Sequence, residues 1–425
     1  MHIVVHDYSG HPFQVQLSRE LARRGHIVRH QFCSSYATGK GALSRDADDP
    51  TTFSVEPQSM GGTFARYSPL KRVAQELRYG LRVGQSLRSS RADVIVMCNI
   101  PLLAHAVTAA LVRAARIPMV FWHQDVYSSA IGGAARRRLG LLGGLIARVA
   151  DGIERAIARS SARVVPISEA FLDVLSRWGV PETDITVIPN WAALPEMPVR
   201  TRDNAWARSH DLVGRNTVLY SGTLGLKHNP RIFVDLAQAL AAQDPSARVV
   251  VISEGRGREY LEAEQTRLSL PNLVLLDYQP YQQLPDALAA ADVLVAVLEP
   301  DSSRYSVPSK VLNYLCAARP VLAVMPASNG AASTLLTSGA GVVVDPADSG
   351  QAVTKLLELL SATEHREQMG AAGRRYAEAT FDITTIGNRF ELVLETAAST
   401  TVLNRSKYHT QQIWTTKETT WEAST

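Results

Sequence analysis

Short apolar runs alternate with longer amphipathic stretches along most of this chain. Residues 3–5 form a β-branched run, a glycine-containing loop follows, and residues 12–24 have the spacing of an amphipathic helix. Strands separated by helices predict β-α-β units and a parallel sheet covered on both faces. Further apolar runs occupy residues 26–28, 94–97, 119–121, 164–167 and 186–188. The first part of the chain is therefore predicted to be a doubly wound α/β domain.

A polar, proline-containing stretch at residues 192–215 interrupts this pattern, which then restarts. We interpret the stretch as a linker between two domains. The predicted fold class is α/β, with two tandem Rossmann-like doubly wound parallel-sheet domains at residues 1–195 and 196–383. The apolar runs of the second domain lie at residues 218–220, 249–252, 273–276, 293–296, 321–323 and 341–344.

The end of the chain divides into a periodic and an aperiodic part. Residues 384–398 carry a helical pattern, and we expect this helix to return to the first domain. Residues 399–425 are rich in threonine and lysine without clear periodicity, which predicts a disordered tail.

Two parallel sheets in tandem already favour one kind of ligand. The carboxyl ends of parallel strands and the amino ends of the helices that follow them gather at one edge of a sheet. Helix amino ends attract anions. Two such domains that face a central cleft therefore predict a phosphate-bearing ligand in that cleft.

Composition narrows the class of protein. The 425 residues suit two domains, and 46% hydrophobic with 20% charged residues is ordinary for a folded soluble chain. A formal net charge of +4 does not indicate nucleic-acid binding. Cys33, Cys98 and Cys316 lack the paired spacing of a zinc site or a disulfide framework. With no signal-peptide pattern and no membrane-spanning apolar run, we expect a cytoplasmic protein.

Candidate chemistry in the first half follows the ends of strands. Gly10, in the first strand-to-helix loop, permits close backbone approach to a ligand, although the loop lacks the G-x-G-x-x-G fingerprint of dinucleotide sites. His123 and Asp125 follow one strand, and Asn99 follows another. A tight turn and hydrogen-bonded buried side chains explain these residues equally well without a ligand.

Loops of the second half combine glycines with cations. Gly222, Gly225 and Lys227 follow the first strand there, and flexible amides with one cation suit a diphosphate leaving group. A solvated lysine in an ordinary loop is the alternative. Gly255 lies in another glycine-rich loop, and Tyr278 follows a further strand.

A second cation falls at a predicted helix start. Pro308 and Ser309 have the residue types of a helix amino end, and Lys310 comes next. Backbone amides at that end would meet an anion, and Lys310 would add charge.

In this order, the segments resemble the family 4 retaining glycosyltransferases of the two-Rossmann GT-B fold. The ordered set is the Gly10 loop, His123, Ser-Gly-x-x-Gly-x-Lys at 221–227, Pro-Tyr-x-x-Leu at 280–284, Ala-Asp-Val at 291–293 and Pro-Ser-Lys at 308–310. Within that family, His-Asp-Tyr-Ser-Gly-His-Pro at 6–12 and Pro-Asn-Trp at 189–191 resemble the branch of colanic-acid and O-antigen polysaccharide biosynthesis.

The resemblance implies a nucleotide-sugar donor, with UDP-sugars favoured, a lipid-linked or glycan acceptor, and no metal or other cofactor. It implies that His123 bonds to the transferred sugar and that Lys227 neutralises the diphosphate. The further roles it implies are diphosphate binding at Gly10, Gly222, Gly225, Val307, Ser309 and Lys310, nucleoside binding at Gly255, Tyr278 and Asn313, and the acceptor or sugar side at Asn99 and Asp125.

Three positions depart from the family pattern. Thr223 stands where an arginine is common, and Tyr305 and Asn313 fall at the usual pair of glutamates. Two other functions therefore stay open: a UDP-sugar epimerase on the same fold and an inactive nucleotide-sugar-binding scaffold. A phosphorylase finds less support, because no lysine lies in a recognisable pyridoxal-binding segment.

Basic and apolar residues are mixed in two segments of the first domain. Arg136, Arg137 and Arg138 precede a leucine-rich stretch, and residues 70–91 repeat the mixture. Such segments can rest on an anionic bilayer. An ordinary amphipathic helix with a solvated basic face is the alternative. We expect peripheral contact with the inner face of the cytoplasmic membrane.

Overall fold

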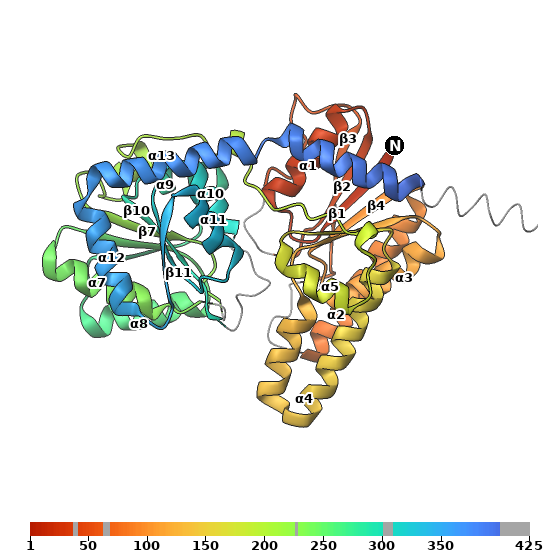
Figure 1. Cartoon of the computed structure of the whole chain (residues 1–425), viewed down its shortest axis with the longest axis horizontal. Coiled ribbons are helices and arrows are strands. Elements are labelled where there is room, and N and C mark those ends of the chain that lie inside the picture. Colours follow the sequence, from red (N-terminus) through yellow and green to blue (C-terminus); the bar gives the residue numbers. More distant parts are fainter. Residues whose placement is uncertain (37–40, 63–68, 226–227, 301–308, 400–425) are drawn as a thin grey trace, which may run out of the picture. The chain divides into compact units, whose positions relative to one another are not determined.

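The computed structural model describes residues 1–36, 41–62, 69–225, 228–300 and 309–399 (Figure 1). These fall into two compact units. Unit 1 comprises Met1–Pro189 and the chain from Ile383 onward, and unit 2 comprises Asn190–Asp382. The division falls at Pro189 rather than at residue 195, and the helix over residues 383–399 belongs to unit 1. Of the predicted tail, residues 400–425 lie outside the described residues.

Unit 1 contains a parallel sheet of six strands in the order β3-β2-β1-β4-β5-β6. Its strands are β1 His2–Asp7, β2 Ile27–Cys33, β3 Phe53–Gln58, β4 Val94–Cys98, β5 Met119–His123 and β6 Arg163–Pro166. Its labelled helices are α1 Pro12–Arg23, α2 Pro69–Ser89, α3 Leu102–Ala114, α4 Tyr127–Ser160 and α5 Leu172–Arg177, with short 3-10 turns at Glu169–Phe171 and Glu182–Asp184.

Unit 2 repeats this architecture, with six parallel strands in the order β12-β11-β10-β7-β8-β9. The strands are β7 Thr217–Ser221, β8 Arg248–Ile252, β9 Leu273–Leu276, β10 Val293–Val297, β11 Val321–Val324 and β12 Gly341–Val344. The helices are α6 Ala205–Ser209, α7 Arg231–Gln243, α8 Arg256–Leu268, α9 Leu284–Ala289, α10 Ser309–Cys316, α11 Gly330–Ser338, α12 Ser349–Ser361 and α13 Thr363–Thr380, with 3-10 turns at Leu194–Glu196 and Tyr281–Gln283. All six strands predicted in this half are confirmed.

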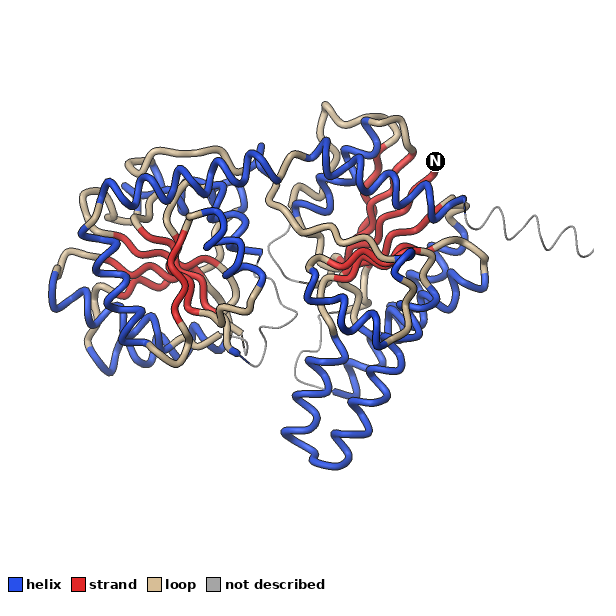
Figure 2. The backbone as a smooth tube through the Cα atoms, viewed as in Figure 1, coloured by secondary structure: helices blue, strands red, loops and turns tan. Residues whose placement is uncertain are grey.

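Helices cover both faces of each sheet (Figure 2). This explains why the central strands are continuous apolar runs rather than alternating ones. β4, β5 and β10 are buried at every position. All strands of each parallel sheet end at the same edge, and polar side chains at that edge can contact a ligand.

In unit 1, one strand prediction was wrong and one strand was missed. Residues 186–188 are not a strand, although the amides of Thr186 and Ile188 donate to carbonyl oxygens of β6 at 3.0 Å. β3, at Phe53–Gln58, was not predicted, because its run Phe-Ser-Val-Glu-Pro-Gln mixes polar residues and a proline, as edge strands do.

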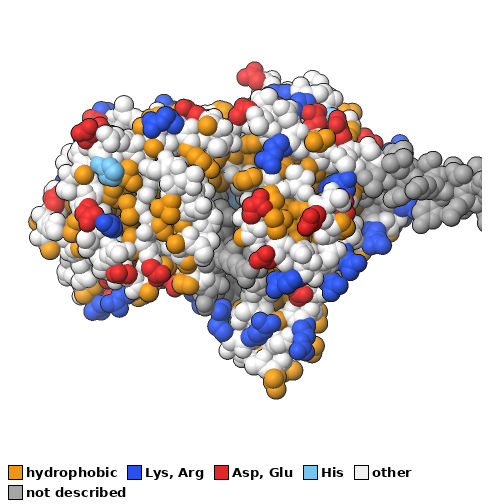
Figure 3. All heavy atoms as spheres, in the orientation of Figure 1, with side chains coloured by type: hydrophobic (Ala, Val, Ile, Leu, Met, Phe, Trp, Pro, Cys, Tyr) orange, Lys and Arg blue, Asp and Glu red, His pale blue; other side chains and the backbone are white. Residues whose placement is uncertain are grey.

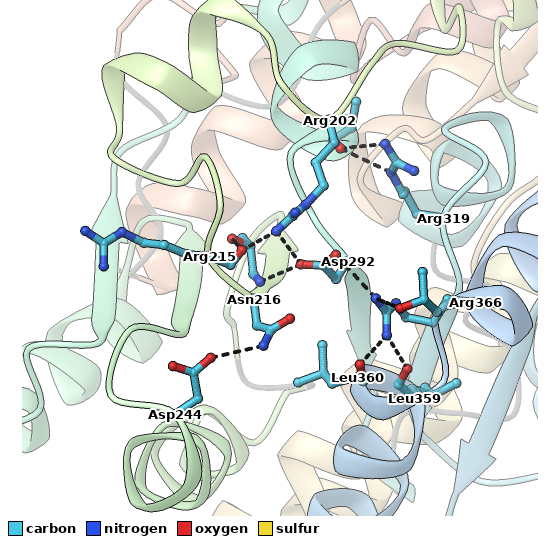
Figure 4. A network of polar contacts seen from close by, with 12 residues as sticks. Arg202, Arg215, Asn216, Asp244, Asp292, Arg319, Leu359, Leu360 and Arg366 are labelled. Atoms are coloured by element: carbon cyan, nitrogen blue, oxygen red, sulfur yellow. Dashed lines mark hydrogen bonds and ion pairs between the residues drawn. The ribbon is translucent and has the colours of Figure 1, made fainter.

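The predicted linker at residues 192–215 is instead anchored in unit 2. Asp292, which directly precedes β10, accepts hydrogen bonds from Arg202 Nη2 at 2.6 Å and from the Thr217 amide at 2.8 Å (Figure 4). Arg366 Nη2 lies 3.8 Å from the other oxygen of Asp292. Arg202 also donates to the Arg215 carbonyl. One carboxylate therefore ties the polar stretch to the sheet and to α13.

α4 is a hairpin of two helical arms rather than one straight helix (Figure 1). Gly140 has φ 53° and ψ −120° inside its span, which breaks the helix and reverses the chain. Residues 127–139 form the first arm, and residues 141–160 form the second. We call residues 127–160 the α4 hairpin and residues 139–146 its tip.

Candidate functional site

The loop that follows β7 places a glycine against a lysine. Gly222 has φ +143°, a conformation that favours glycine, and its amide donates to the Ile252 carbonyl at 3.0 Å. A Cβ atom at Gly222 would lie 3.1 Å from Lys310 Cε. Because glycine has no side chain, Lys310 can lie directly against the loop at this position.

Lys310, the second residue of α10, is half-buried beside an aromatic ring. Its Nζ lies 2.5 Å from the Tyr220 hydroxyl and 4.1 Å from the centroid of the Tyr220 ring. Loss of hydration lowers the pKa of Lys310 to about 7. The amine is therefore partly neutral near pH 7, and a nearby anion would favour its charged form.

Hydroxyl groups connect the lysine to the rest of the loop. Tyr220 donates to the Thr223 carbonyl at 2.9 Å, and Thr223 Oγ1 lies 2.5 Å from the Tyr278 hydroxyl. Tyr314 accepts a hydrogen bond from the Ser221 amide at 3.0 Å. Thr223, which stands at the family's arginine position, therefore joins the loop to Tyr278, the residue predicted to lie at the nucleoside.

The loops that follow β7 and β8 hold each other in place. The Leu224 amide donates to Ser253 Oγ at 3.0 Å. At Gly257, near the start of α8, a Cβ atom would lie 2.5 Å from the Leu224 Cβ. Gly255 precedes that helix with φ +92°. Gly225 donates its amide to His228 Nδ1 at 3.2 Å.

Unit 2 therefore brings Gly222, Tyr278 and Lys310 into one cluster at the carboxyl edge of its sheet. Ser309 is exposed at the first position of α10, and Asn313 is half-buried one turn further along. Lys227 and Val307, two predicted diphosphate ligands, lie outside the described residues, as does Tyr305. Sequence reasoning missed Tyr220 and Tyr314, because an aromatic residue inside a strand or helix is usually core.

A pocket of about 200 Å³ opens at the same edge of the sheet, beyond β10 and β11. Its polar lining includes Asn229, Arg231, Asp235 and Glu299. Arg231 Nε lies 3.7 Å from an oxygen of Asp235. None of these residues was predicted as a site residue, although Asn229 and Pro230 directly precede α7, of which Arg231 is the first residue.

The corresponding loop of unit 1 contains a carboxylate. Asp7, the buried last residue of β1, accepts hydrogen bonds from the amides of Ser9 at 3.0 Å and His11 at 2.6 Å. Burial raises the pKa of the Asp7 carboxyl, against the effect of these bonds. Gly10 has φ +73°, and a Cβ atom there would lie 2.8 Å from Leu43 Cδ1. Asp7 thus occupies the amides on either side of Gly10, and the contact of Gly10 with the donor diphosphate stays a prediction.

Asn99 lies next to the same carboxylate. Its Nδ2 lies 3.2 Å from Asp7 Oδ1. In the amide orientation that satisfies both of its polar atoms, Gln14 donates to Asp7 Oδ2 at 2.7 Å and accepts from Asn99 Nδ2 at 3.3 Å. Its backbone has φ 58°, and its carbonyl accepts a hydrogen bond from the Tyr127 hydroxyl at 3.1 Å. Asp125 is partly buried between β5 and α4. Their predicted roles on the acceptor side stay predictions.

His123 ends β5 and has no exposed surface. Its ring lies 4.5 Å from the Phe121 ring and 4.9 Å from the Phe171 ring, measured between centroids. Its Nε2 is 3.6 Å from Glu154 Oε1, and neither ring nitrogen has a hydrogen-bond partner within the described part of the chain. His123 thus lies beneath the surface, and its contact with the transferred sugar stays a prediction.

Glu154, which sequence reasoning missed, caps the amino end of the α4 hairpin. Its side chain is 1% exposed and accepts hydrogen bonds from the amides of Tyr127 at 2.9 Å and Ser128 at 2.8 Å. A carboxylate at this position satisfies the first amides of the helix and complements its dipole. The cap lies 27 residues from Tyr127 along the chain, beyond any local capping pattern.

The predicted membrane-facing residues are all at the surface. Arg136, Arg137 and Arg138 are exposed on the first arm of the α4 hairpin. The other predicted segment forms α2, which exposes an apolar row at Val73, Leu77 and Leu81.

Comparisons with known proteins identify both units. Residues 11–191 match the glycosyl transferase 4-like domain, and residues 203–376 match the glycosyl transferases group 1 family. The chain therefore belongs to the family 4 glycosyltransferases and has the GT-B fold class, which confirms both predictions.

Two curated relatives match parts of the chain. The putative colanic acid biosynthesis glycosyl transferase WcaI of Escherichia coli is 25% identical over 58% of this chain and 60% of its own length. The GDP-mannose-dependent monoacylated alpha-(1-6)-phosphatidylinositol monomannoside mannosyltransferase of Corynebacterium glutamicum is 29% identical over 38% of this chain and 42% of its own length. Each match covers less than two thirds of the relative.

Solved structures share the fold over nearly the whole chain. Anabaena Alr3699/HepE in complex with UDP and glucose superposes with a TM-score of 0.67 at 19% identity, over 93% of this chain and 99% of that one. Sucrose-phosphate synthase from Thermosynechococcus elongatus gives a TM-score of 0.71 at 16% identity, over 94% and 100%. At such identities the likeness shows the fold alone.

Proposed function

We propose that this protein transfers a sugar, with retention of configuration, from a nucleotide-sugar to a lipid-linked or other glycan acceptor in cell-surface polysaccharide or glycolipid biosynthesis. The observation that carries the proposal is the cluster on unit 2. There a glycine loop and the amino end of α10 meet at Lys310. A diphosphate leaving group needs such a cation and such amides.

Lys310 would supply charge when the diphosphate develops it. Its amine is half-buried and only partly protonated near pH 7, so an arriving diphosphate would raise its pKa and complete an ion pair. Groups already in place stabilise the transition state without reorganisation. With Lys227, predicted for the same role, two lysines would neutralise the leaving group. The transfer would then need no metal, and activity is expected to survive EDTA.

A UDP-sugar is the favoured donor. The solved HepE structures contain UDP, UDP with glucose, and UDP-glucose. The Corynebacterium relative is named as GDP-mannose-dependent, so GDP-sugars are the alternative to test. Tyr278 and Asn313 would face the nucleoside, where the neutral amide of Asn313 can bond to a ribose hydroxyl.

The names of the relatives support an acceptor at a membrane. One relative is assigned to colanic acid biosynthesis, and the other acts on a monoacylated phosphatidylinositol mannoside. The protein would then act peripherally at the inner face of the cytoplasmic membrane, with Asn99, Asp125 and His123 on the sugar and acceptor side.

A two-stage experiment tests the transfer. A thermal-shift screen with UDP- and GDP-sugars identifies the donor, since a ligand at 100 times its dissociation constant stabilises the fold by about 2.7 kcal/mol. Release of nucleoside diphosphate is then followed with and without a polyprenyl-linked saccharide. We expect a UDP-sugar to give the larger shift and release to depend on the acceptor. Donor binding without turnover on any acceptor would contradict the enzyme proposal.

A further inference from the structure

The α4 hairpin packs its arms together through small residues. A Cβ atom at Gly143 would lie 2.2 Å from the Ala135 carbonyl oxygen, and one at Gly132 would lie 2.9 Å from the Ala147 Cβ. The backbones of the two arms therefore touch closely, with no room between them for a large side chain. Helix pairs in soluble proteins normally bury their large apolar residues at the contact.

The large apolar residues of this hairpin point outward instead. Leu141 is 97% exposed and Leu142 is 68% exposed, at the point where the chain reverses. Leu139, Leu145, Ile146 and Val149 are between 41% and 58% exposed. Single exposed leucines are ordinary, but six large exposed apolar side chains within one hairpin are the kind of grouping that marks an interaction surface. We call these six residues the apolar patch of the hairpin.

Positive charge surrounds this patch. The segment from Tyr127 to Ala150 contains four arginines, Arg136, Arg137, Arg138 and Arg148, and neither aspartate nor glutamate. All four arginines are exposed. Figure 3 shows the hydrophobic end of the hairpin with basic side chains beside it. An apolar tip flanked by arginines is typical of segments that enter an anionic lipid interface.

The base of the α4 hairpin is fixed by hydrogen bonds, and its tip lies away from the sheet. Glu154 on the second arm caps the first amides of the first arm, so a buried carboxylate fixes the base. From that base the first arm rises about 20 Å, at about 1.5 Å per residue. In the parts of the chain that the structure describes, no helix is long and apolar enough to cross a membrane.

We propose that the tip of the α4 hairpin inserts into the interface of an anionic lipid bilayer. Leu141 and Leu142 enter the acyl boundary, and Arg136, Arg137, Arg138 and Arg148 bind the headgroup phosphates. This inference deepens the peripheral membrane attachment of the proposed function, on which it rests, and it can be tested without sugar transfer. It assigns membrane attachment to one protruding element of unit 1, with an apolar contribution that the arginines alone do not supply.

Charge favours a bilayer over a second copy of this chain as the partner. Two hairpins that met tip to tip would bring eight arginines together with no acidic residue in either tip to compensate them. Like charges at such an interface oppose association. An anionic bilayer presents the opposite charge and an apolar layer directly beneath it.

The experiment is flotation of the full chain with vesicles of phosphatidylcholine mixed with phosphatidylglycerol. We expect the wild type to float with them, and L141Q/L142Q to lose at least about tenfold in partition coefficient. Removal of the arginines with R136S/R137S/R138S should abolish the preference over pure phosphatidylcholine vesicles. Leu392→Gln, which changes a 65% exposed leucine elsewhere on unit 1, is the matched control and should float as the wild type does.

A second readout separates insertion from general charge attraction. Leu142→Cys carries an environment-sensitive fluorophore, and the native cysteines of the chain are buried. Its emission should shift to the blue on anionic vesicles. Thermal melting and nucleotide binding, measured without lipid, should match the wild type for every variant, so failure of docking and failure of sugar transfer are distinguishable.

Three results would overturn the proposal. L141Q/L142Q could float as well as the wild type, or Leu392→Gln could lose as much binding. The third is a wild-type dimer in lipid-free sedimentation that L141Q/L142Q abolishes, combined with no flotation, which would identify a second copy as the partner.

Discussion

The first strand-to-helix loops of the two units hold the same place in their sheets and lie next to side chains of opposite charge. In unit 1, the loop amides of Ser9 and His11 point at the buried carboxylate of Asp7. In unit 2, the equivalent loop contains no acidic residue between Ser221 and Gly225, and it lies against Lys310. The shared topology fixes where a ligand can meet a strand end, whereas the side chains there decide the charge of that ligand.

On this difference we propose that the donor diphosphate binds to unit 2. A phosphate at the unit 1 loop would compete with Asp7 for the same amides and meet its negative charge. At the unit 2 loop it would meet a lysine that has lost part of its hydration, which strengthens the attraction between the charges. If the donor diphosphate binds there, substitutions beside the unit 2 loop should change nucleotide affinity and transfer more than substitutions at the unit 1 loop.

Removal of the lysine should have the largest effect. Lys310→Met keeps roughly the length of the side chain but removes the charge and the contacts of Nζ with Tyr220. We expect kcat/KM for the donor to fall about 100-fold, or about 2.7 kcal/mol, as when one preorganised group is lost from a transition state. Steady-state assays of nucleoside diphosphate release measure this change.

Lys355 on α12 is the control, because Nζ of this partly exposed lysine is ion-paired to Glu358 at 2.7 Å in the same unit. Lys355→Met should change kcat/KM less than about twofold, as expected for an exposed pair. Equal effects of the two substitutions would show that general charge, rather than the site, attracts the donor.

The pKa of Lys310 predicts a pH dependence of donor binding. The loop needs the charged amine, and the free protein loses that proton above about pH 7. Affinity for UDP should therefore fall roughly tenfold between about pH 7 and about pH 8.5, and binding should take up protons. Calorimetry in buffers of different ionisation enthalpy detects this uptake. Lys310→Met should bind weakly with no such dependence, and a parallel fall in the variant would refute the assignment.

The same group predicts the opposite trend for stability. Because the pKa of Lys310 is lower in the folded chain than its usual 10.5, the unfolded chain binds more protons between about pH 7 and 10.5. The free energy of unfolding should therefore rise with pH in that window in the wild type, and Lys310→Met should lack this contribution. Chemical denaturation at several pH values measures the difference.

The fold was largely readable from the sequence, because buried parallel strands appear as short continuous apolar runs. All six strands of unit 2 were predicted from such runs. The prediction failed for the polar edge strand β3, because this strand is not buried along its whole length and has no continuous apolar run. It also failed at the α4 hairpin, where Gly140 reverses a segment that reads as one amphipathic stretch.

The site was readable only in part. Glycines beside strand ends and the helix start at Ser309 are local signals, and they led to Gly222 and Lys310. The partners of these residues come from distant positions. Tyr220 lies 90 residues from Lys310, and Glu154 lies 27 residues from the amide it caps, so no local pattern could reveal either contact.

An added methyl group at Gly222 should disturb the site less than loss of the lysine. In Gly222→Ala, the positive φ becomes strained and the new Cβ lies 3.1 Å from Lys310 Cε. Strain of about 1 kcal/mol should weaken UDP binding about fivefold. Gly339→Ala is the matched control, since Gly339 also has a positive φ, of 67°, but lies at the end of α11. If both variants bound UDP equally well, the contact with Lys310 would have no role.

The smallest effect on nucleotide affinity is expected at the unit 1 loop. Asp7→Asn keeps the shape of the side chain but turns an NH₂ group toward the amides of Ser9 or His11. We expect the affinity for UDP to change less than about twofold, and the free energy of unfolding at pH 5 to fall by about 1 kcal/mol.

Burial raises the pKa of the Asp7 carboxyl, so the folded chain keeps the carboxyl proton at pH values where the unfolded chain has lost it. The stabilising contribution of Asp7 relative to asparagine should therefore shrink as pH rises toward neutrality. Calorimetric melting and UDP titration of one preparation measure both quantities. A loss of UDP affinity as large as that of Lys310→Met would mean that both loops hold the donor, and the contrast between the units would fail.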